Sequence, residues 1–320
     1  MAEILNKTAA VAEFILVGFT HIRWLQILLF WLLLLTYLLT IVGNLLIIYI
    51  TLVDRRLQTP MYFFLRNFSF LEIGFTSSAI PKALFNLASA TGSKSISLAG
   101  CFIQNFLYFV LGTTDFLLVI VMSVDRYIAI CNPLHYLTIM NGRICSLLVL
   151  SCWAGGLSLF LVPSIVLFQM PFCGPNIINH FFCDSGPLIK LACVDTRLVE
   201  LNYFLIAILS LLGTLAVNIV SYIKIISRIL HIPSATGRKK TFSTCASHMT
   251  VVSIAYSSCI VMYMKPKGTG ELDFNKIVAL LNTVVAPFLV PFIYCLRNRQ
   301  VQDALMAELR QWTGFCKKLR

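Results

Sequence analysis

Residues 25–52 read LQILLFWLLLLTYLLTIVGNLLIIYITL, and no charged side chain interrupts the run. About 20 consecutive apolar residues in a helix cross the ~30 Å hydrocarbon core of a bilayer, so this stretch is long enough to span a membrane. It is also longer than the apolar region of a cleavable signal peptide, and residues 1–24 precede it as a lead. The pattern therefore predicts a permanent transmembrane helix.

Six more apolar runs of this kind follow along the chain. Runs rich in Leu, Ile, Val and Phe favour helices over barrel strands, in which apolar and polar residues alternate. The composition agrees, because 58% of the 320 residues are hydrophobic and only 12% are charged, about half the charged fraction of a soluble domain. We predict an all-α membrane protein, a seven-transmembrane helix bundle, with helices at residues 25–52, 60–88, 98–130, 144–169, 198–229, 241–264 and 274–296.

The chain divides into an N-terminal segment at residues 1–24, a transmembrane domain at 25–296 and a tail at 297–320. In the tail, apolar residues recur about every four positions, at Val301, Leu305, Leu309 and Trp312. This period predicts a short amphipathic C-terminal helix on the inner membrane surface.

The basic residues are distributed unevenly between the two sides of the predicted bundle. With the N-terminus outside, most of the 25 Lys and Arg lie at the cytoplasmic helix ends, in the loop between the fifth and sixth helices, and in the tail. The positive-inside rule then favours an extracellular N-terminus and a cytoplasmic C-terminus. This orientation and attraction to anionic lipid account for the net charge of +12, which is also compatible with docking of an acidic partner.

Two further observations bear on partners and modification. Basic and aromatic residues do not interleave as they do on nucleic-acid-binding surfaces, so we predict no nucleic acid partner. The sequon that begins at Asn6 falls on the predicted outer side, where glycosylation occurs.

Four of the 11 cysteines lie at or beyond the predicted outer membrane surface: Cys101, Cys173, Cys183 and Cys193. An even number in an oxidising compartment predicts two disulfides, and spacing alone leaves three possible pairings. A zinc site that includes the nearby His180 is the competing interpretation, but the loop has no closely spaced CxxC pair. We therefore predict no metal and no cofactor.

The sequence contains no catalytic signature. It has neither a phosphate-binding glycine loop nor an HExxH motif, and its five histidines are scattered. These absences argue against an enzyme. A transporter or channel for a small solute is another function open to a helix bundle of this kind, but the chain has no internal repeat of the kind that transporters carry.

Two acids fall within predicted transmembrane helices, Glu72 and Asp115. An acid at membrane depth is costly and is a functional candidate by default. Asp115 lies 11 residues before Arg126, about 16 Å along a helix, and Glu72 lies at a similar depth in its own helix. We expect the two carboxyls to share a proton or a small cation. The alternative is a pair of protonated acids that are hydrogen-bonded to their neighbours.

Five motifs occur in order along the chain and at matching helices. They are Gly43-Asn44, TPMYFFL at residues 59–65, MSVDRYIAICNPLHY at 122–136, KTFSTCASH at 240–248 and PFIYCLRN at 291–298. With these motifs the chain resembles the olfactory receptors, a branch of the rhodopsin-like G-protein-coupled receptors. The KTFSTCASH form is similar to the terrestrial-type class.

The resemblance implies a plasma-membrane receptor for small volatile molecules that activates a stimulatory G protein and raises cAMP. It implies that Arg126 faces the G protein and is held at rest by the neighbouring Asp125. It also implies disulfides Cys101–Cys183 and Cys173–Cys193, and a ligand-sensing position at Tyr256. Further residues assigned to G-protein coupling are Tyr127, Tyr222 and His248, and the basic loop residues Lys239 and Lys240 are expected to help dock the G protein.

The chain departs from the family pattern at three places. Ser123-Val124 stands where the family usually has Ala-Tyr, and Asp115 stands where it usually has Glu. Val290 replaces the Asn that usually precedes the proline of the seventh helix. In the family that Asn links the mid-membrane polar groups to the seventh helix.

We predict that the ligand pocket lies in the outer half of the bundle, between the third, fifth and sixth helices. Residues three or four apart share a helix face, and those faces are aromatic and aliphatic with a few hydroxyls. Receptors for amines carry an Asp where this chain has Tyr108, so we expect a neutral or weakly polar ligand. The predicted pocket residues are Tyr108, Phe109, Gly112, Thr113, Ile206, Ala207, Ser210, Tyr256, Cys259, Ile260 and Tyr263.

Overall fold

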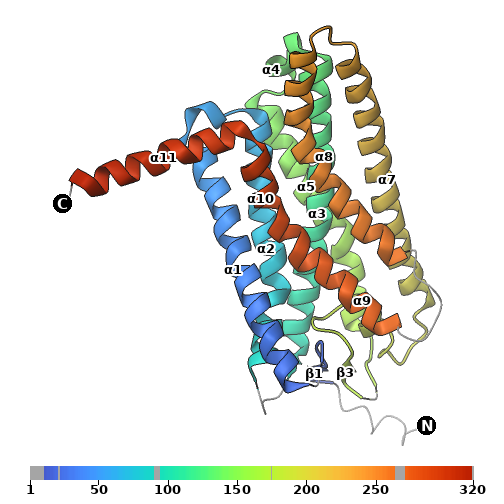
Figure 1. Ribbon diagram of the computed structural model, residues 1–320. Helices are drawn as coiled ribbons and strands as arrows, with labels where there is room; N and C mark the ends of the chain where they lie inside the picture. Colours follow the sequence, from blue (N-terminus) through green and yellow to red (C-terminus); the bar gives the residue numbers. More distant parts are fainter. Residues whose placement is uncertain (1–10, 21, 90–93, 174, 264–270, 319–320) are drawn as a thin grey trace, which may run out of the picture.

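Long helices run side by side through the length of the molecule in the computed structural model (Figure 1). The structure describes residues 11–20, 22–89, 94–173, 175–263 and 271–318. For some residues within the helices it describes the backbone alone. The long helices in this part of the chain are α1 (Arg23–Val53), α2 (Pro60–Ala88), α3 (Leu98–Cys131), α5 (Gly142–Gln169), α7 (Arg197–Leu230) and α8 (Ala235–Tyr263). A seventh is built from α9 (Glu271–Leu280), the π-helical turn η3 (Leu281–Val285) and α10 (Ala286–Arg297).

Short elements connect the bundle. They are η1 (Arg55–Leu57), η2 (Pro133–His135), α4 (Tyr136–Ile139) and α6 (Ser185–Ile189), with strands β1 (Glu13–Leu16), β2 (Ser95–Ser97) and β3 (Ile177–Ile178). The last helix, α11 (Arg299–Lys318), leaves the bundle at a steep angle (Figure 1). We call the end with the strands the sheet end and the end with α11 the tail end.

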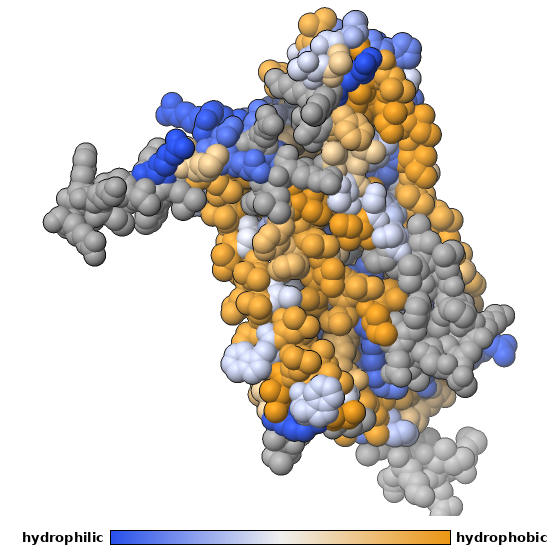
Figure 2. Space-filling model, in the orientation of Figure 1, coloured by the Kyte–Doolittle hydropathy of each residue, from blue (hydrophilic) through white to orange (hydrophobic). Residues whose placement is uncertain are grey.

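The outer surface of the bundle is apolar along its length. Five of the helices in the described residues are long and apolar enough to cross a membrane. Trp24 and Trp31 of α1 are 66% and 63% exposed, an arrangement that water does not favour and lipid does. Figure 2 shows the apolar band between hydrophilic ends. α2 also spans the bundle but contains Arg66, Glu72 and Lys82, so its composition is less apolar.

Small residues allow the helices to approach closely. A Cβ atom placed on Gly43 of α1 would lie 2.8 Å from the Cβ of Pro291 in α10. A Cβ on Gly156 of α5 would lie 2.9 Å from the carbonyl oxygen of Val110 in α3. Both distances are below van der Waals contact, so only glycine permits these two helix pairs to pack as they do.

A small sheet closes one end of the bundle. β1 lies in the centre, antiparallel to β2 and parallel to β3. Phe14 and Leu16 of β1 are fully buried, and with Phe172 and Ile178 they form a hydrophobic cluster beneath the loops. The N-terminal segment is therefore folded onto the sheet end, although the sequence pattern did not indicate a strand there.

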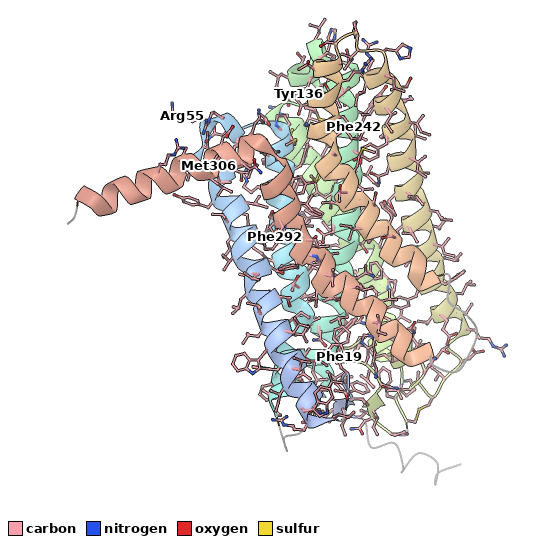
Figure 3. All side chains as sticks on the ribbon, viewed as in Figure 1. Phe19, Arg55, Tyr136, Phe242, Phe292 and Met306 are labelled. Carbon is pink, nitrogen blue, oxygen red and sulfur yellow. A yellow bond between two sulfur atoms is a disulfide. The ribbon has the colours of Figure 1, made fainter. Side chains whose placement is uncertain are left out.

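α11 packs its predicted apolar face against the tail end. Val301 and Ala304 are fully buried, and Leu305 packs against the main core. The Tyr62 hydroxyl of α2 donates to Asn298 Oδ1 at 3.2 Å and to Gln300 Oε1 at 2.7 Å, which fixes the start of α11. Arg55 and Met306 mark the region where α11 passes beside η1 (Figure 3). The side chains of Leu309 and Trp312 lie outside the described residues.

Candidate functional site

A cavity of about 240 Å³ lies inside the bundle. α3 contributes the largest share of its wall, and α2, α5, α7, the α9–α10 helix and the loop before α6 contribute the rest. Phe and Tyr make up a third of the wall residues, among them Phe68, Phe75, Phe109, Phe116 and Phe160. A volume below the roughly 300–1,000 Å³ of drug-sized sites suits a ligand with few heavy atoms.

Six of the predicted pocket residues line this cavity. On α3 they are Tyr108, Phe109, Gly112 and Thr113, and on α7 they are Ala207 and Ser210. Ile206 and Tyr256 are not part of the described wall. Tyr256 is instead buried, with its hydroxyl accepting from Asn218 Nδ2 at 3.1 Å and its ring 5.5 Å from that of Phe116, which does line the cavity. The side chains of Cys259, Ile260 and Tyr263 lie outside the described residues.

Part of the cavity wall comes from a loop that sequence reasoning did not include. His180, Phe182 and Asp184 reach the cavity from the segment between α5 and α6. The Phe182 ring lies 4.3 Å from that of Tyr108, which in turn lies 4.7 Å from Phe75. The sequence analysis contained a clue to this. A disulfide between Cys183 and the third helix must hold the residues on either side of Cys183 near that helix.

The seventh helix also supplies wall residues that were not predicted, among them Asn275, Asn282 and Ala286. Asn282 belongs to the π-helical turn η3, a type of helix irregularity that is frequent at functional sites. In the same turn, the hydroxyl of Thr283 is 3.0 Å from that of Tyr108. This hydrogen bond connects the cavity wall on α3 directly to the irregular part of the seventh helix.

The two membrane-depth acids open onto the same cavity. Glu72 is 5% exposed, and both Glu72 and Asp115 line the wall. Asp115 Oδ1 is buried without a hydrogen-bond partner among the described atoms. The cavity is therefore continuous with the acid pair, a connection that the sequence did not indicate. A shared proton or cation between the two carboxyls stays a prediction.

Burial shifts the two titratable loop groups in opposite directions. It lowers the pKa of His180 to about 3, with the positive charge of Lys276 as a second cause. It raises the pKa of Asp184 to about 6, against the backbone N–H groups of Ser185 and Gly186, which favour the charged carboxylate. His180 is therefore neutral at physiological pH.

Two disulfides fix the loop over the cavity. Cys101 of α3 is bonded to Cys183 with Cα atoms 5.4 Å apart, and Cys173 is bonded to Cys193 with Cα atoms 5.6 Å apart. These are the pairs that the family resemblance implied. Because all four sulfurs are used, the alternative zinc site has no thiolate ligands here.

Hydrogen bonds from α3 hold the same loop in place. The Asn105 side chain donates to the Cys183 carbonyl at 2.8 Å and to Ser185 Oγ at 3.0 Å. Gln104 Oε1 accepts from the Cys183 N–H at 3.0 Å. The backbone around Cys183 is thus fixed by covalent and polar contacts together.

A second cluster of predicted residues lies at the tail end. Arg126 forms a buried ion pair with Asp125, with Nε 2.9 Å from Oδ2. The Tyr136 hydroxyl donates to Asp125 Oδ1 at 2.7 Å. A small hollow beside the pair is lined by Met61, Met122, His248, Tyr294 and Asn298. Arg126 is therefore held in place, next to residues of four other elements.

Buried polar contacts link α3, α7 and α8 between the cavity and this cluster. Ser123 hydrogen-bonds Asn218, which also contacts Tyr256. Tyr222 hydrogen-bonds His248. Ser123 is one of the departures from the family pattern, and its hydroxyl adds a contact that Ala cannot make. Another departure, Val290, is 3% exposed and fills its site with apolar atoms alone.

Three other residues were predicted for coupling. Tyr127 is half-buried, and Lys224 Nζ lies 5.5 Å from the centre of its ring. Lys239 and Lys240 belong to the first turns of α8, but their side chains lie outside the described residues.

Comparisons with known proteins give a consistent result. A family model described as olfactory receptor matches residues 33–311. Mouse olfactory receptor 6E1 is 59% identical over 311 residues, which cover 97% of this chain and 98% of that protein. Human olfactory receptor 6C2 is 50% identical over 98% of this chain and 100% of its own length. Among solved structures, squid rhodopsin is similar with a TM-score of 0.72 at 15% identity, covering 92% of this chain and 83% of that one.

Proposed function

The chain belongs to the olfactory receptor family, with the fold of the rhodopsin-like G-protein-coupled receptors, and from this premise we propose how it binds its ligand and signals. It is a multi-pass plasma-membrane protein with an odorant receptor function, and its relatives are receptors rather than enzymes. We propose that a small, mostly neutral volatile molecule occupies the cavity and that the receptor then activates a stimulatory G protein, which raises cAMP.

In the proposed orientation the sheet end faces the outside of the cell. Both disulfides lie at this end, where an oxidising compartment allows them to persist. The described basic residues Arg55, Arg143, Lys224 and Arg228 lie toward the opposite end, in accord with the positive-inside rule. Asn6, the proposed glycosylation site, lies outside the described residues.

The observation that carries the ligand proposal is the aromatic cavity itself. Thr113 and Ser210 add hydroxyls to a wall that also contains the carboxyls of Glu72, Asp115 and Asp184 and the amides of Asn275 and Asn282. A carbonyl or hydroxyl group on the ligand therefore has a hydrogen-bond partner among the aromatic and aliphatic side chains. An aldehyde, alcohol, ester or ketone fits this chemistry. Since such a ligand has few atoms, we expect micromolar or weaker affinity.

The first experiment fills the cavity. In Ala207→Leu the added atoms occupy ligand space, so the cAMP response to a confirmed agonist should be lost at unchanged surface expression. Ala216→Leu is the matched control, because Ala216 lies on an exposed part of the same helix. An unchanged response in Ala207→Leu would place the ligand elsewhere.

The second experiment removes single polar groups and keeps the shape. Thr113→Val and Ser210→Ala each delete a hydroxyl of the cavity wall, and Tyr263→Phe deletes the hydroxyl of a further predicted pocket residue. A concentration series on each variant measures the shift in the agonist response. At least one of the three should shift the response about tenfold, the value of one lost hydrogen bond of roughly 1.4 kcal/mol. If none does, the proposed contacts are wrong.

The coupling proposal rests on the buried pair at the tail end. Arg126, with Asp125, Tyr127, Tyr222 and His248, would face the G protein once α8 moves outward, and Lys239 and Lys240 would help it dock. Arg126→Ala should abolish the cAMP response and leave surface expression and ligand binding nearly intact. Arg143→Ala, at an exposed position of the same end, serves as the control. Full signalling by Arg126→Ala would refute the role.

For the acid pair we propose that Glu72 and Asp115 share a proton or a sodium-like ion that stabilises one receptor state. The measurement is the agonist concentration series in sodium and in choline buffer. The wild type should respond differently in the two buffers, and Glu72→Gln or Asp115→Asn should remove the difference.

A further inference from the structure

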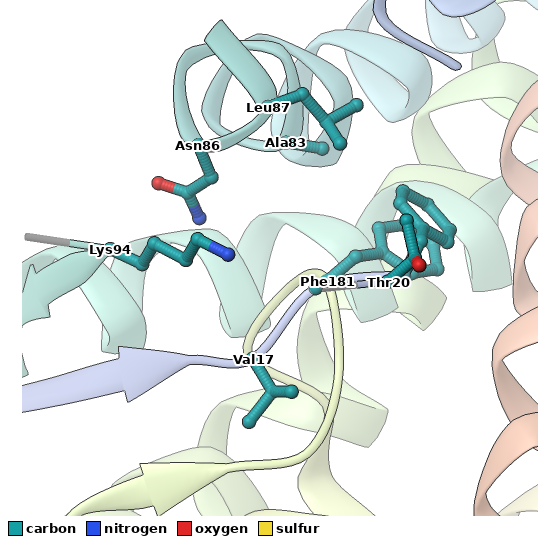
Figure 4. Close-up of a pocket in the computed structure, with 9 residues that line it drawn as sticks. Val17, Thr20, Ala83, Asn86, Leu87, Lys94 and Phe181 are labelled. Carbon is teal, nitrogen blue, oxygen red and sulfur yellow. The ribbon is translucent and has the colours of Figure 1, made fainter. Parts of the chain in front are cut away.

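A second, much smaller pocket lies at the sheet end, away from the ligand cavity (Figure 4). Its wall comes from the N-terminal segment at residues 17–20, the last turns of α2, Lys94 and Phe181. Its volume is about 10 Å³, which is room for one species of about the size of a water molecule. Segments far apart in the sequence therefore meet around a space that fits a single small ligand.

Asn86 of α2 supplies an unsatisfied amide to this pocket. The residue is only 5% exposed, and neither Asn86 Oδ1 nor Asn86 Nδ2 has a hydrogen-bond partner among the described atoms. A buried amide without partners costs free energy, because it has lost its hydrogen bonds to water. The amide therefore indicates a ligand that is small enough to share the pocket.

Lys94 faces the same space from the opposite side. In Figure 4 its ammonium group and the Asn86 amide nitrogen point toward one another. None of the nine described residues that line the pocket is acidic. The Lys94 ammonium and the Asn86 amide both donate hydrogen bonds, and no carboxylate lies between them in the described wall. They therefore need a small ligand that accepts hydrogen bonds.

The C-terminal end of α2 does not repel a negative charge in this pocket. The carbonyl oxygens at a helix C-terminus carry partial negative charge. Here Arg23 donates to the carbonyl of Leu87 at 3.2 Å and to that of Ala88 at 3.4 Å. The Arg23 guanidinium therefore offsets the partial negative charge at the end of the helix. The charged side chains around the pocket are then positive.

We propose that this pocket binds one monovalent anion of the chloride class, held by the Lys94 ammonium and the Asn86 amide. The ion satisfies both donors and neutralises the lysine. It also fastens the N-terminal segment, next to Gly18 and Thr20, against α2 and Phe181. Phe19 of this segment stacks on Phe181 with ring centres 4.6 Å apart, so the anion stabilises a contact that leads toward the loop over the ligand cavity.

The test compares halide with a bulky anion on the purified full-length receptor. Thermal unfolding is measured in sodium chloride and in sodium gluconate at equal ionic strength, because gluconate is too large for the pocket. Wild type should unfold at a temperature roughly 2–4 °C higher in chloride, the shift expected for modest site occupancy. Lys94→Met and Asn86→Leu should lose this difference. Lys190→Met, at an exposed position of the same end, should keep it.

A measurement on the wild type alone keeps the proposal testable if the variants fail to fold. Exchange between free chloride and a protein site broadens the chloride NMR line. Bromide should compete for the site and make the chloride line narrow again. Equal unfolding temperatures in the two salts, or no broadening, would mean that the pocket holds water only and would overturn the proposal. Neither readout needs an odorant, so the outcome is independent of the proposed receptor function.

Discussion

The two ends of the bundle are closed by different chemistry. The sheet end is held by two disulfides, a three-stranded sheet and fully buried rings such as those of Phe14 and Phe181. The tail end is held by the ion pair of Arg126 and Asp125, a few hydrogen bonds and the packing of Val301 and Ala304 of α11. The comparison teaches that one end is built to keep its shape while the other is built from contacts that can exchange for new ones.

The difference fits a molecule that carries a signal from one end to the other. A ligand cavity with a fixed wall retains its selectivity, because covalent bonds hold the loop residues that line it. A cluster closed only by polar contacts can open at a cost of a few kcal/mol, the size of allosteric coupling energies. The predictions below test this contrast, beginning with the largest expected effect.

Loss of the disulfide that closes the longer loop should lower the stability of the protein most. The bond from Cys101 to Cys183 spans 82 residues of sequence, against 20 for the bond from Cys173 to Cys193. Removing a native disulfide costs about 2–5 kcal/mol, and the longer loop adds about 1 kcal/mol in the chain-entropy account. The double variant Cys101→Ala with Cys183→Ala should therefore nearly abolish surface expression, measured by antibody binding to intact cells.

Two controls sharpen this result. The double variant Cys173→Ala with Cys193→Ala should lose less surface receptor, and Cys131→Ala, at a free and half-buried cysteine, should lose almost none. Equal losses in the two disulfide variants would contradict the ranking by loop length.

Removal of the charge that holds Arg126 should open the tail end. Breaking a buried ion pair from one side leaves the other charge unpaired and destabilises that state by roughly 3–5 kcal/mol. Asp125→Asn should therefore raise cAMP at least several-fold without any agonist, normalised to surface receptor. Asp54→Asn is the control, because Asp54 pairs with the largely exposed Arg56 at the same end. Unchanged basal cAMP in Asp125→Asn would argue against a resting role for the pair.

The sheet end should respond to pH through two opposed groups. The folded protein keeps His180 neutral down to about pH 3, whereas the unfolded chain protonates it near 6.5, so acidification below 6.5 lowers stability. Asp184 takes up its proton near pH 6 when folded and near 3.8 when unfolded, so acidification from 6 to 4 raises stability. The two contributions offset each other in the wild type.

Single variants separate the two contributions. Asp184→Asn should lose thermal stability more steeply than the wild type as the pH falls from 6 to 4. His180→Phe should gain stability over the same range. Unfolding temperatures of the purified receptor across this range provide the measurement, and identical slopes in both variants would exclude the assignment.

The smallest expected effect belongs to Tyr136. Its hydroxyl donates one hydrogen bond to Asp125, and the ion pair remains when that bond is lost. A single hydrogen bond contributes about 1 kcal/mol net, so Tyr136→Phe should raise basal cAMP roughly fivefold or less. A larger rise than in Asp125→Asn would reverse the order of importance at the tail end.

Most helix bounds could be predicted from the sequence to within about three residues, but the sixth helix begins at Ala235 rather than at the predicted residue 241. The run at 25–52 became α1 at Arg23–Val53, and the run at 198–229 became α7 at Arg197–Leu230. Hydrocarbon thickness fixes the length of an apolar helix, and a helix satisfies its own backbone hydrogen bonds, so the signal is contained in each segment. The amphipathic tail was visible for the same reason, because its period is local, whereas the role of Arg126 was implied by the family resemblance.

Only the tertiary structure decided which side chains surround the cavity and the pocket at Lys94. His180 and Asp184 reach the cavity because a disulfide draws their loop over the bundle, and β1 forms because two distant loops offer it partners. Asn86 and Lys94 look unremarkable in the sequence until the N-terminal segment folds across them. Helix formation is local, whereas a cavity depends on the relative placement of segments that are far apart in the chain. Packing, hydrogen bonds between those segments and disulfides fix that placement.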